Sequence, residues 1–232
     1  MNSACFQKLK HQEFELFLRE CVGLVQFRCL MLPGPTSRLG SPSKTEFVSM
    51  STTYNLVSEL EKLATALDEA RDGAPTDVPL GSVAERIAKE LEVRRDEVAI
   101  MALSTRWKHL YFLAPAELKN VGYVPLSSNS ALAARTARDS RPEIVNNFAA
   151  VRHASVFEGV KIGSEGAEAI QKIISAPILA EGRVVGIIQV SRKGPNAMNA
   201  GPDFTASELG KVLALCKPLG KLLLHLAADQ EL

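Results

Sequence analysis

Residues 172–194, which read KIISAPILAEGRVVGIIQVSRKG, constrain the possible folds of this chain more than any other segment. Two apolar runs are joined by residues 180–183 (AEGR), and Gly182 can adopt the positive φ that a tight hairpin turn requires. Along residues 184–190 both alternating sets of side chains are largely apolar, so both faces of this strand must be covered. We therefore predict a β-hairpin in the middle of a sheet, with a covering layer on each side.

Two further segments read as strands of the same sheet. Residues 97–104 (EVAIMALS) and 109–114 (HLYFLA) are rich in apolar and aromatic residues and are separated by a short polar turn. Between them and the hairpin, the sequence predicts a short helix over 126–141, a short strand over 142–148 and a long irregular loop over 149–169. This order predicts an α+β fold with one antiparallel sheet.

Amphipathic helices are predicted on either side of the strands. From Tyr54 onward, apolar residues recur on one helical face at Leu56, Leu60, Leu63, Leu67 and Ala70. A second helix is predicted over 80–93, and a capping box of Thr205 and Glu208 opens a long closing helix that Pro218 should kink. The apolar seam of the closing helix consists of Leu209, Val212, Cys216, Leu219, Leu223 and Leu226. Helices of this length are marginal in water, so these seams must pack on the sheet, on each other or on a second copy of the chain.

The first 49 residues differ in character from the rest. They hold three of the four cysteines and five of the nine phenylalanines. Their apolar run is interrupted by Gln26 and Arg28 and follows acidic residues, which does not fit a secretory signal. We expect residues 1–49 to be a poorly ordered N-terminal extension, either an over-called translation start or a functional arm. Residues 50–78 are then predicted to be an amphipathic helix and linker, and residues 79–232 the main domain.

Charge and cysteine usage narrow the function classes. The net charge of +1 argues against a nucleic-acid binder with a broad basic surface. No run of about 20 apolar residues occurs, so no membrane partner is expected. The cysteines at 5, 21, 29 and 216 lack metal-site spacing, and their wide separation favours reduced thiols in a cytoplasm. The sequence predicts no metal site and leaves any cofactor unknown.

The hairpin and the segment after it resemble the GAF domain family. Residues 176–178 (API) precede the turn and residues 186–190 (GIIQV) follow it, as in GAF strand motifs, and residues 204–209 (FTASEL) resemble the opening of the closing helix. The resemblance covers about residues 80–227. It implies an antiparallel sheet with the terminal helices on one face and, on the other, a pocket roofed by the middle helix and loops. It also implies a regulatory protein without catalysis of its own, which senses a small molecule and signals through helix packing, often as a homodimer through its terminal helices.

GAF subfamilies with well-defined chemistry fit this sequence less well. The asparagine-lysine-phenylalanine-aspartate signature of cyclic-nucleotide-binding members is missing from the sequence. Bilin-binding members and free methionine sulfoxide reductases need cysteines in or near the pocket. The resembling region has one cysteine, Cys216, at a seam position where a small buried apolar role is expected.

Polar residues of the middle helix and the following loop are the first candidate ligand contacts. Arg135 and Arg138 lie three residues apart and should point the same way, and arginine offers a planar fork for carboxylate or phosphate. Residues that could join them around an anionic or amide-bearing ligand are Arg141, Asn146, Asn147, Arg152 and His153. The alternatives are a solvated helix face for the arginines and a structural hydrogen bond for His153.

The hairpin supplies two more candidates, Lys172 and Gln189. Lys172 lies at the end of the hairpin where Arg192 and Lys193 close the second strand, and charges there either contact a ligand or keep the sheet edge soluble. Gln189 is the polar member of an apolar strand and must find a partner if it is buried. That partner is either a ligand or another core residue.

Two rival functions remain. Residues 82–103 have the rhythm of a helix-turn-helix DNA-binding regulator, although the would-be recognition helix over 95–103 is too apolar to face a groove. The other rival is a GAF-type enzyme such as a free methionine sulfoxide reductase, although the sequence shows no nucleophile with its base, phosphate loop or metal cluster. A strand at residues 98–103 would exclude the DNA-binding interpretation.

Overall fold

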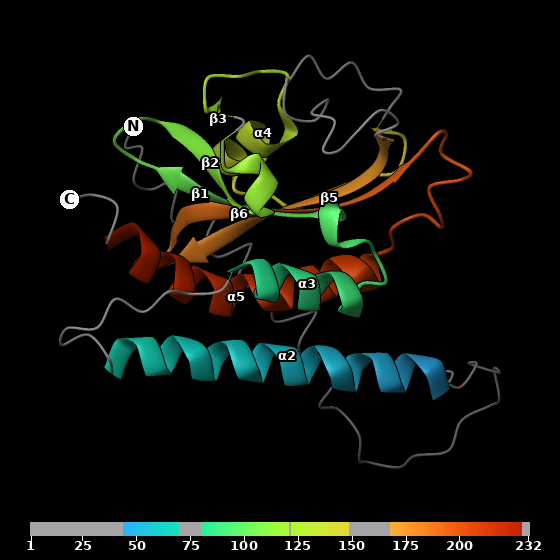
Figure 1. Ribbon diagram of the computed structural model, residues 1–232, viewed down its shortest axis with the longest axis horizontal. Coiled ribbons are helices and arrows are strands. Elements are labelled where there is room, and N and C mark those ends of the chain that lie inside the picture. Colours follow the sequence, from blue (N-terminus) through green and yellow to red (C-terminus); the bar gives the residue numbers. More distant parts are fainter. Residues whose placement is uncertain (1–43, 70–79, 121, 149–167, 229–232) are drawn as a thin grey trace, which may run out of the picture. The chain divides into compact units, whose positions relative to one another are not determined.

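The computed structural model describes residues 44–69, 80–120, 122–148 and 168–228 (Figure 1). The chain divides into two compact units, Met1–Pro42 and Ser43–Leu232, and all the described residues belong to the second. Its elements, in chain order, are α2 (Lys44–Glu69), α3 (Leu80–Glu90), the short 3-10 helix η1 (Arg95–Glu97), β1 (Val98–Ser104), β2 (His109–Ala114), the 3-10 helix η2 (Ala116–Leu118), β3 (Tyr123–Pro125), α4 (Leu132–Asp139), β4 (Glu143–Val145), β5 (Ala169–Ala180), β6 (Arg183–Gly194) and α5 (Ala206–Ala228). The fold is α+β, as predicted. In this described part, no helix combines the length and the apolar character that crossing a bilayer requires.

The strands form one six-stranded antiparallel sheet in the order β3-β2-β1-β6-β5-β4. The predicted hairpin, β5 and β6, lies in the middle, and Glu181 and Gly182 join its strands. Both turn residues have positive φ, 49° and 73° respectively, which suits a two-residue turn that follows the twist of the strands. The predicted strand pair is also confirmed as β1 and β2, whereas the three-residue edge strand β3 is not predicted by the sequence.

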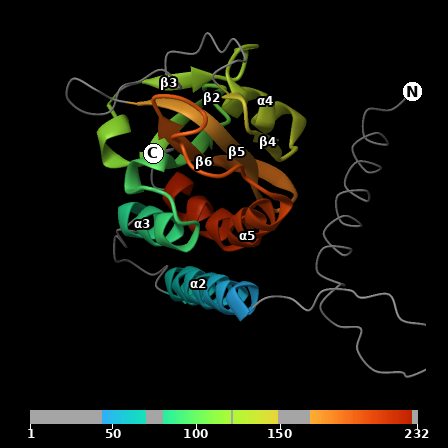
Figure 2. The ribbon, with the colours of Figure 1, turned by 90° about the vertical axis from the view of Figure 1, so that its right-hand side faces the viewer.

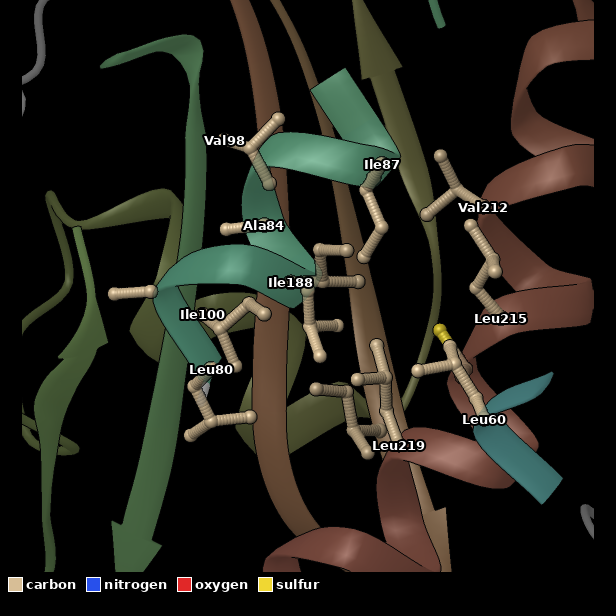
Figure 3. Close-up of a cluster of buried hydrophobic side chains, with 14 of the residues drawn as sticks. Leu60, Leu80, Ala84, Ile87, Val98, Ile100, Ile188, Val212, Leu215 and Leu219 are labelled. Carbon is tan, nitrogen blue, oxygen red and sulfur yellow. The ribbon is translucent and has the colours of Figure 1, made fainter. Parts of the chain in front are cut away.

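Both faces of the sheet are covered. Figures 1 and 2 show α4 against one face and α3 and α5 against the other, with α2 lying outside α3 and α5. The main core lies between the sheet and these helices, where Ile87 of α3, Ile188 of β6 and Leu219 of α5 are fully buried together with Leu60 of α2 (Figure 3). Burying each of these side chains stabilises the fold by about 1.5–3 kcal/mol.

The apolar stripes of the first and last helices pack against each other within one chain. Leu60 and Leu67 of α2 are buried in the same cluster as Leu219 of α5. α2 begins at Lys44, ahead of the predicted start near Tyr54. Packing within one chain therefore accounts for the burial of these stripes. The homodimer through the terminal helices stays a prediction.

The helix-turn-helix interpretation of residues 82–103 is wrong. Val98–Ser104 form the strand β1, which is paired with β2 on one side and with β6 on the other. Val98 and Ile100 are buried in the main core. A strand enclosed between two others cannot present a recognition helix to a DNA groove.

Two glycines allow α5 and the central strands to approach closely. A Cβ atom at Gly220 of α5 would lie closer than 3.0 Å to the carbonyl oxygen of Leu179 in β5, and one at Gly186 of β6 would lie that close to the carbonyl oxygen of Met101 in β1. A larger residue at Gly220 would push the backbone of α5 away from β5, and one at Gly186 would push β6 away from β1. The closing helix therefore rests directly on the hairpin at Gly220.

Candidate functional site

A buried polar cluster lies between α4 and the sheet. It consists of Thr136 of α4, Ser175 of β5 and Gln189 of β6, whose exposed fractions are 2%, 0% and 8%. The Thr136 hydroxyl donates to the carbonyl oxygen of Leu132 at 3.0 Å and lies 2.8 Å from the Ser175 hydroxyl. The Gln189 amide donates to the Ser175 hydroxyl at 3.4 Å. Because a hydroxyl has one proton to donate, the chain of donors runs from Gln189 to Ser175, then to Thr136 and to the helix backbone.

The register of the hairpin creates this cluster. Ser175 stands directly opposite Gln189 in the β5–β6 ladder, and cross-strand neighbours on one face are close enough to hydrogen-bond. Most neighbouring side chains on this side of the sheet are apolar, among them Ile187 of β6 and Ala133 and Ala137 of α4. Apart from Ser191, which lies two residues along β6 and bonds the carbonyl oxygen of Glu97, the three polar groups are thus surrounded by apolar side chains.

The two candidate arginines of α4 do not meet on one partner. Nη2 of Arg135 donates to both carboxylate oxygens of Glu143 in β4, at 2.8 Å each. Nη1 of Arg138 donates to the carbonyl oxygens of Leu126 and Ser128, the latter at 2.7 Å. Arg135 therefore fastens α4 to the edge strand, and Arg138 holds the turn that leads into the helix.

Two other candidates, Asn146 and Lys172, come together on the segment before α5. Asn146 donates through Nδ2 to the carbonyl oxygen of Phe204 at 3.0 Å and accepts its N–H at 2.9 Å. Nζ of Lys172 donates to the carbonyl oxygen of Gly201 at 2.6 Å and pairs with Asp203 at 2.7 Å. These contacts lie on the α5 side of the sheet, because Lys172 is opposite Arg192, whose guanidinium stacks over the ring of Phe204.

The remaining candidates are exposed or lie outside the described residues. Arg141 and Asn147 are exposed. Arg152 and His153, with residues 149–167 around them, lie outside the described residues. Of the candidates predicted from the sequence, Gln189 alone among the described residues is part of the buried cluster beneath α4.

A second buried polar group joins the start of β1 to the end of β6. The buried carboxylate of Glu97 accepts the backbone N–H of Arg94 at 2.7 Å and that of Lys193 at 2.6 Å. Nζ of Lys193 donates to the backbone carbonyl and the carboxylate of Asp96, at 2.6 and 2.7 Å. Partial burial acts to raise the pKa of Asp96, but the hydrogen bond and charge of Lys193, together with Arg94, outweigh it and hold the pKa below its usual value. We assign this group to stability.

Cys216, the one cysteine among the described residues, is buried in the main core, as predicted. Burial raises the pKa of its thiol to about 12, so almost no thiolate exists near neutral pH. We expect iodoacetamide at about pH 8, below the ordinary thiol pKa, to leave Cys216 unmodified in the native chain and to label it after unfolding, as read by peptide mapping. Labelling of Cys216 in the native protein would show that α5 opens or that the thiol is reactive.

Sequence reasoning missed Ser175 and Thr136. Ser175 interrupts the apolar run IISAPI, and a hydroxyl inside a two-faced apolar strand was a usable signal because buried polar groups need partners. Pairing the hairpin about residues 181–182 alone places Ser175 opposite Ile188, and the register shift between Ile178 and Leu179 is what brings it opposite Gln189. Thr136 gave no such signal, since nothing in the sequence fixes how α4 lies on the sheet.

The comparisons with known proteins agree on one fold. The family model described as GAF domain matches residues 77–221. The GAF domain of a phosphoenolpyruvate-protein phosphotransferase from Acinetobacter superposes with a TM-score of 0.54 at 16% identity, covering 78% of this chain and 95% of that one. The corresponding domain from Coxiella burnetii gives 0.55 at 12% identity, covering 79% and 99%.

An enzyme is also among the similar structures. The free methionine-R-sulfoxide reductase from Neisseria meningitidis superposes with a TM-score of 0.52 at 13% identity, covering 83% of this chain and 98% of that one. At such identities the likeness shows the fold alone. No curated protein is significantly similar to the chain in sequence.

Proposed function

Because the chain belongs to the GAF domain family, whose members are generally regulatory or sensory, we propose that it senses a small molecule beneath α4. The ligand would contact Gln189, Ser175 and Thr136, and the response would be a change in the packing of α5 and α2. In this proposal the chain acts in the cytoplasm, regulates a partner and catalyses no reaction itself.

The observation that carries this proposal is the polar cluster in an apolar surface. Small-molecule sites are mostly apolar, with a few placed polar groups that fix the orientation of the ligand. The 3.4 Å separation between the Gln189 amide and the Ser175 hydroxyl is long for a hydrogen bond, so exchanging this bond for one to a ligand costs little. A ligand with an amide or carbonyl group fits these neutral partners.

The contacts of the other candidates favour supporting roles. Arg135, Asn146 and Lys172 bind other parts of the chain through two contacts each. An anionic ligand would have to displace Glu143 from Arg135 or Asp203 from Lys172. Asn147 and His153 remain proposed ligand contacts.

The same strand supplies a route from the ligand to the closing helix. Ile188 and Val190, the neighbours of Gln189 in β6, lie on the opposite face and pack in the core shared with α5. A shift of Gln189 toward a ligand therefore moves backbone on which α5 rests. We further propose that the signal reaches a second chain in a homodimer through the terminal helices.

The decisive experiment is native mass spectrometry of the full chain purified from its own host, which reports both retained small molecules and the number of chains. We expect a retained ligand in the wild-type protein and at least about fivefold weaker retention in Gln189→Leu, since the loss of a buried hydrogen bond costs about 1–3 kcal/mol. Hydrogen exchange with and without the ligand should differ along α5 and α2.

The matched control is Ser191→Ala, two residues further along the same face of β6, where the hydroxyl donates to the carbonyl oxygen of Glu97 instead. This variant should retain the ligand at the wild-type level. The proposal would be contradicted if the wild-type protein carried no small molecule and gained no thermal stability from a metabolite extract of its host. Equal ligand loss in the two variants would remove Gln189 from the site.

A further inference from the structure

The turn between β1 and β2 presents a fixed aromatic side chain at its tip. Trp107 is 66% exposed, although its backbone N–H is held by the hydroxyl of Ser104 at 3.2 Å. The guanidinium of Arg106 lies over the indole, 5.0 Å from its centroid, and Lys108 closes the turn with a φ of 51°. A residue other than glycine rarely adopts such a backbone, so this turn holds Trp107 out in a definite geometry.

A second pair of aromatic side chains continues from the turn along the edge of the sheet. Tyr123 of the edge strand β3 is 57% exposed, and the ring of His109 lies 4.6 Å from it. Of the four exposed large hydrophobic side chains in the described ranges, two, Trp107 and Tyr123, are in this region. Monomeric proteins expose single apolar residues freely, but grouped ones mark interaction surfaces.

The same region is positively charged, although the whole chain is nearly neutral. Residues 98–138 contain one acidic residue, Glu117, and five Lys or Arg residues: Arg106, Lys108, Lys119, Arg135 and Arg138. Glu143 neutralises Arg135, but Arg138 stays near the tip, because it binds the carbonyl oxygen of Leu126, whose N–H donates to Lys108. The neighbouring β5–β6 turn adds no net charge, since its Arg183 pairs with Glu181. The partner of this surface should therefore be anionic.

We propose that this tip, formed by Arg106, Trp107, Lys108, His109 and Tyr123, docks the protein on an anionic lipid surface. Tryptophan and tyrosine settle at the headgroup level of a bilayer because their rings are apolar with one polar edge. Lysine and arginine beside them gain from anionic headgroups. This contact goes beyond the proposed sensing function and does not depend on it. The contact is peripheral, so it needs no helix that crosses the bilayer, and none is found among the described residues.

The geometry favours lipid over other anionic partners. Bases of single-stranded nucleic acid stack on free ring faces, whereas Arg106 covers one face of Trp107 and His109 packs on Tyr123. Addition of a peptide strand to β3 is disfavoured by Pro125, which has no N–H to offer at that edge. Two exposed large apolar side chains are also few for the apolar centre of a globular protein interface.

Trp107 is the only tryptophan of the chain, so its fluorescence reports from the tip itself. The experiment titrates the full-length protein with phosphatidylcholine vesicles that contain about 30% phosphatidylglycerol, at about 0.1 M salt, where exposed charges still act over about 10 Å. We expect a blue shift of the emission and quenching by brominated acyl chains. Pure phosphatidylcholine vesicles should bind at least tenfold more weakly, as should the mixed vesicles at about 1 M salt.

Charge variants test the assignment by co-sedimentation with the same vesicles. Arg106→Gln combined with Lys108→Gln should weaken binding about 25-fold, since each cation near an anionic bilayer contributes about fivefold. The matched control is Lys62→Gln combined with Lys89→Gln, which removes the same charge from exposed positions on α2 and α3 and should bind as the wild type does. Unfolding midpoints of both double variants verify that they are folded.

Three results would overturn the proposal. The first is an emission spectrum that mixed vesicles leave unchanged. The second is an equal loss of binding in the two double variants, which would show an undirected charge effect. The third is a response to a single-stranded thymidine oligonucleotide in the absence of any response to vesicles, which would reassign the tip to nucleic acid. None of these outcomes affects ligand retention beneath α4, so the two proposals fail separately.

Discussion

Replacing Gly220 by alanine is expected to destabilise the protein by about 3 kcal/mol, because the new methyl group has no room. Its Cβ would lie closer than 3.0 Å to the carbonyl oxygen of Leu179 and just 3.0 Å from the carbonyl carbon. The obstacle is the backbone of β5, which cannot rotate aside as a flexible side chain could. Helix α5 must therefore lift from the hairpin, and its contacts with Ile178 and Ile188 in the main core loosen with it.

Gly210, in the same helix, provides the matched control. A Cβ atom there meets nothing within 4 Å, so Gly210→Ala should stabilise the protein by about 0.5–1 kcal/mol through helix propensity alone. The two variants are compared by urea unfolding followed by circular dichroism. Two stability changes of the same sign and similar size would contradict the close approach of α5 to β5.

Glu97→Ala is the second change with a large expected effect, a loss of about 3 kcal/mol or more in the free energy of unfolding. The carboxylate accepts two backbone N–H groups, those of Arg94 and Lys193. Each would be left without its acceptor at a partly buried site, which costs about 1–3 kcal/mol. The nearby guanidinium of Arg94, 3.3 Å from the carboxylate, loses a charge partner as well.

An exposed acid of the same type serves as the comparison for Glu97. Glu85 pairs with Arg95 at 3.0 Å, but both side chains are about half exposed, so Glu85→Ala should change stability by no more than about 0.5 kcal/mol. Guanidinium unfolding curves measure both variants. If Glu97→Ala proved as mild as Glu85→Ala, the β1 and β6 ends would not be joined through this carboxylate.

The strands and helices of the domain were largely predictable because their signals are local. Two apolar runs with Glu181 and Gly182 between them predict the hairpin. The capping box of Thr205 and Glu208 marks the start of α5. β3 escaped prediction because three residues ending in Pro125 carry too little pattern to register as a strand.

The candidate site was less predictable because its contacts join distant elements. Helical spacing correctly places Arg135 and Arg138 on neighbouring turns, but it cannot show that one reaches Glu143 and the other the turn at Leu126. Likewise, the docking of α4 decides that Thr136 meets Ser175. Such pairings depend on how layers stack, which a single sequence does not encode in a readable local pattern.

The three attachments at the start of α5 decide how that helix can move. Asn146 accepts the backbone N–H of Phe204, and Lys172 pairs with Asp203. Arg192 pairs with Glu208 in the first turn of α5 at 2.7 Å. Toward the far end of the helix, Nε2 of His225 lies 3.0 Å from the carboxylate of Asp68 in α2. A rearrangement of α5 on the sheet would therefore have to break polar contacts at the first turn, but mainly apolar packing around Leu219 and Leu223 further along.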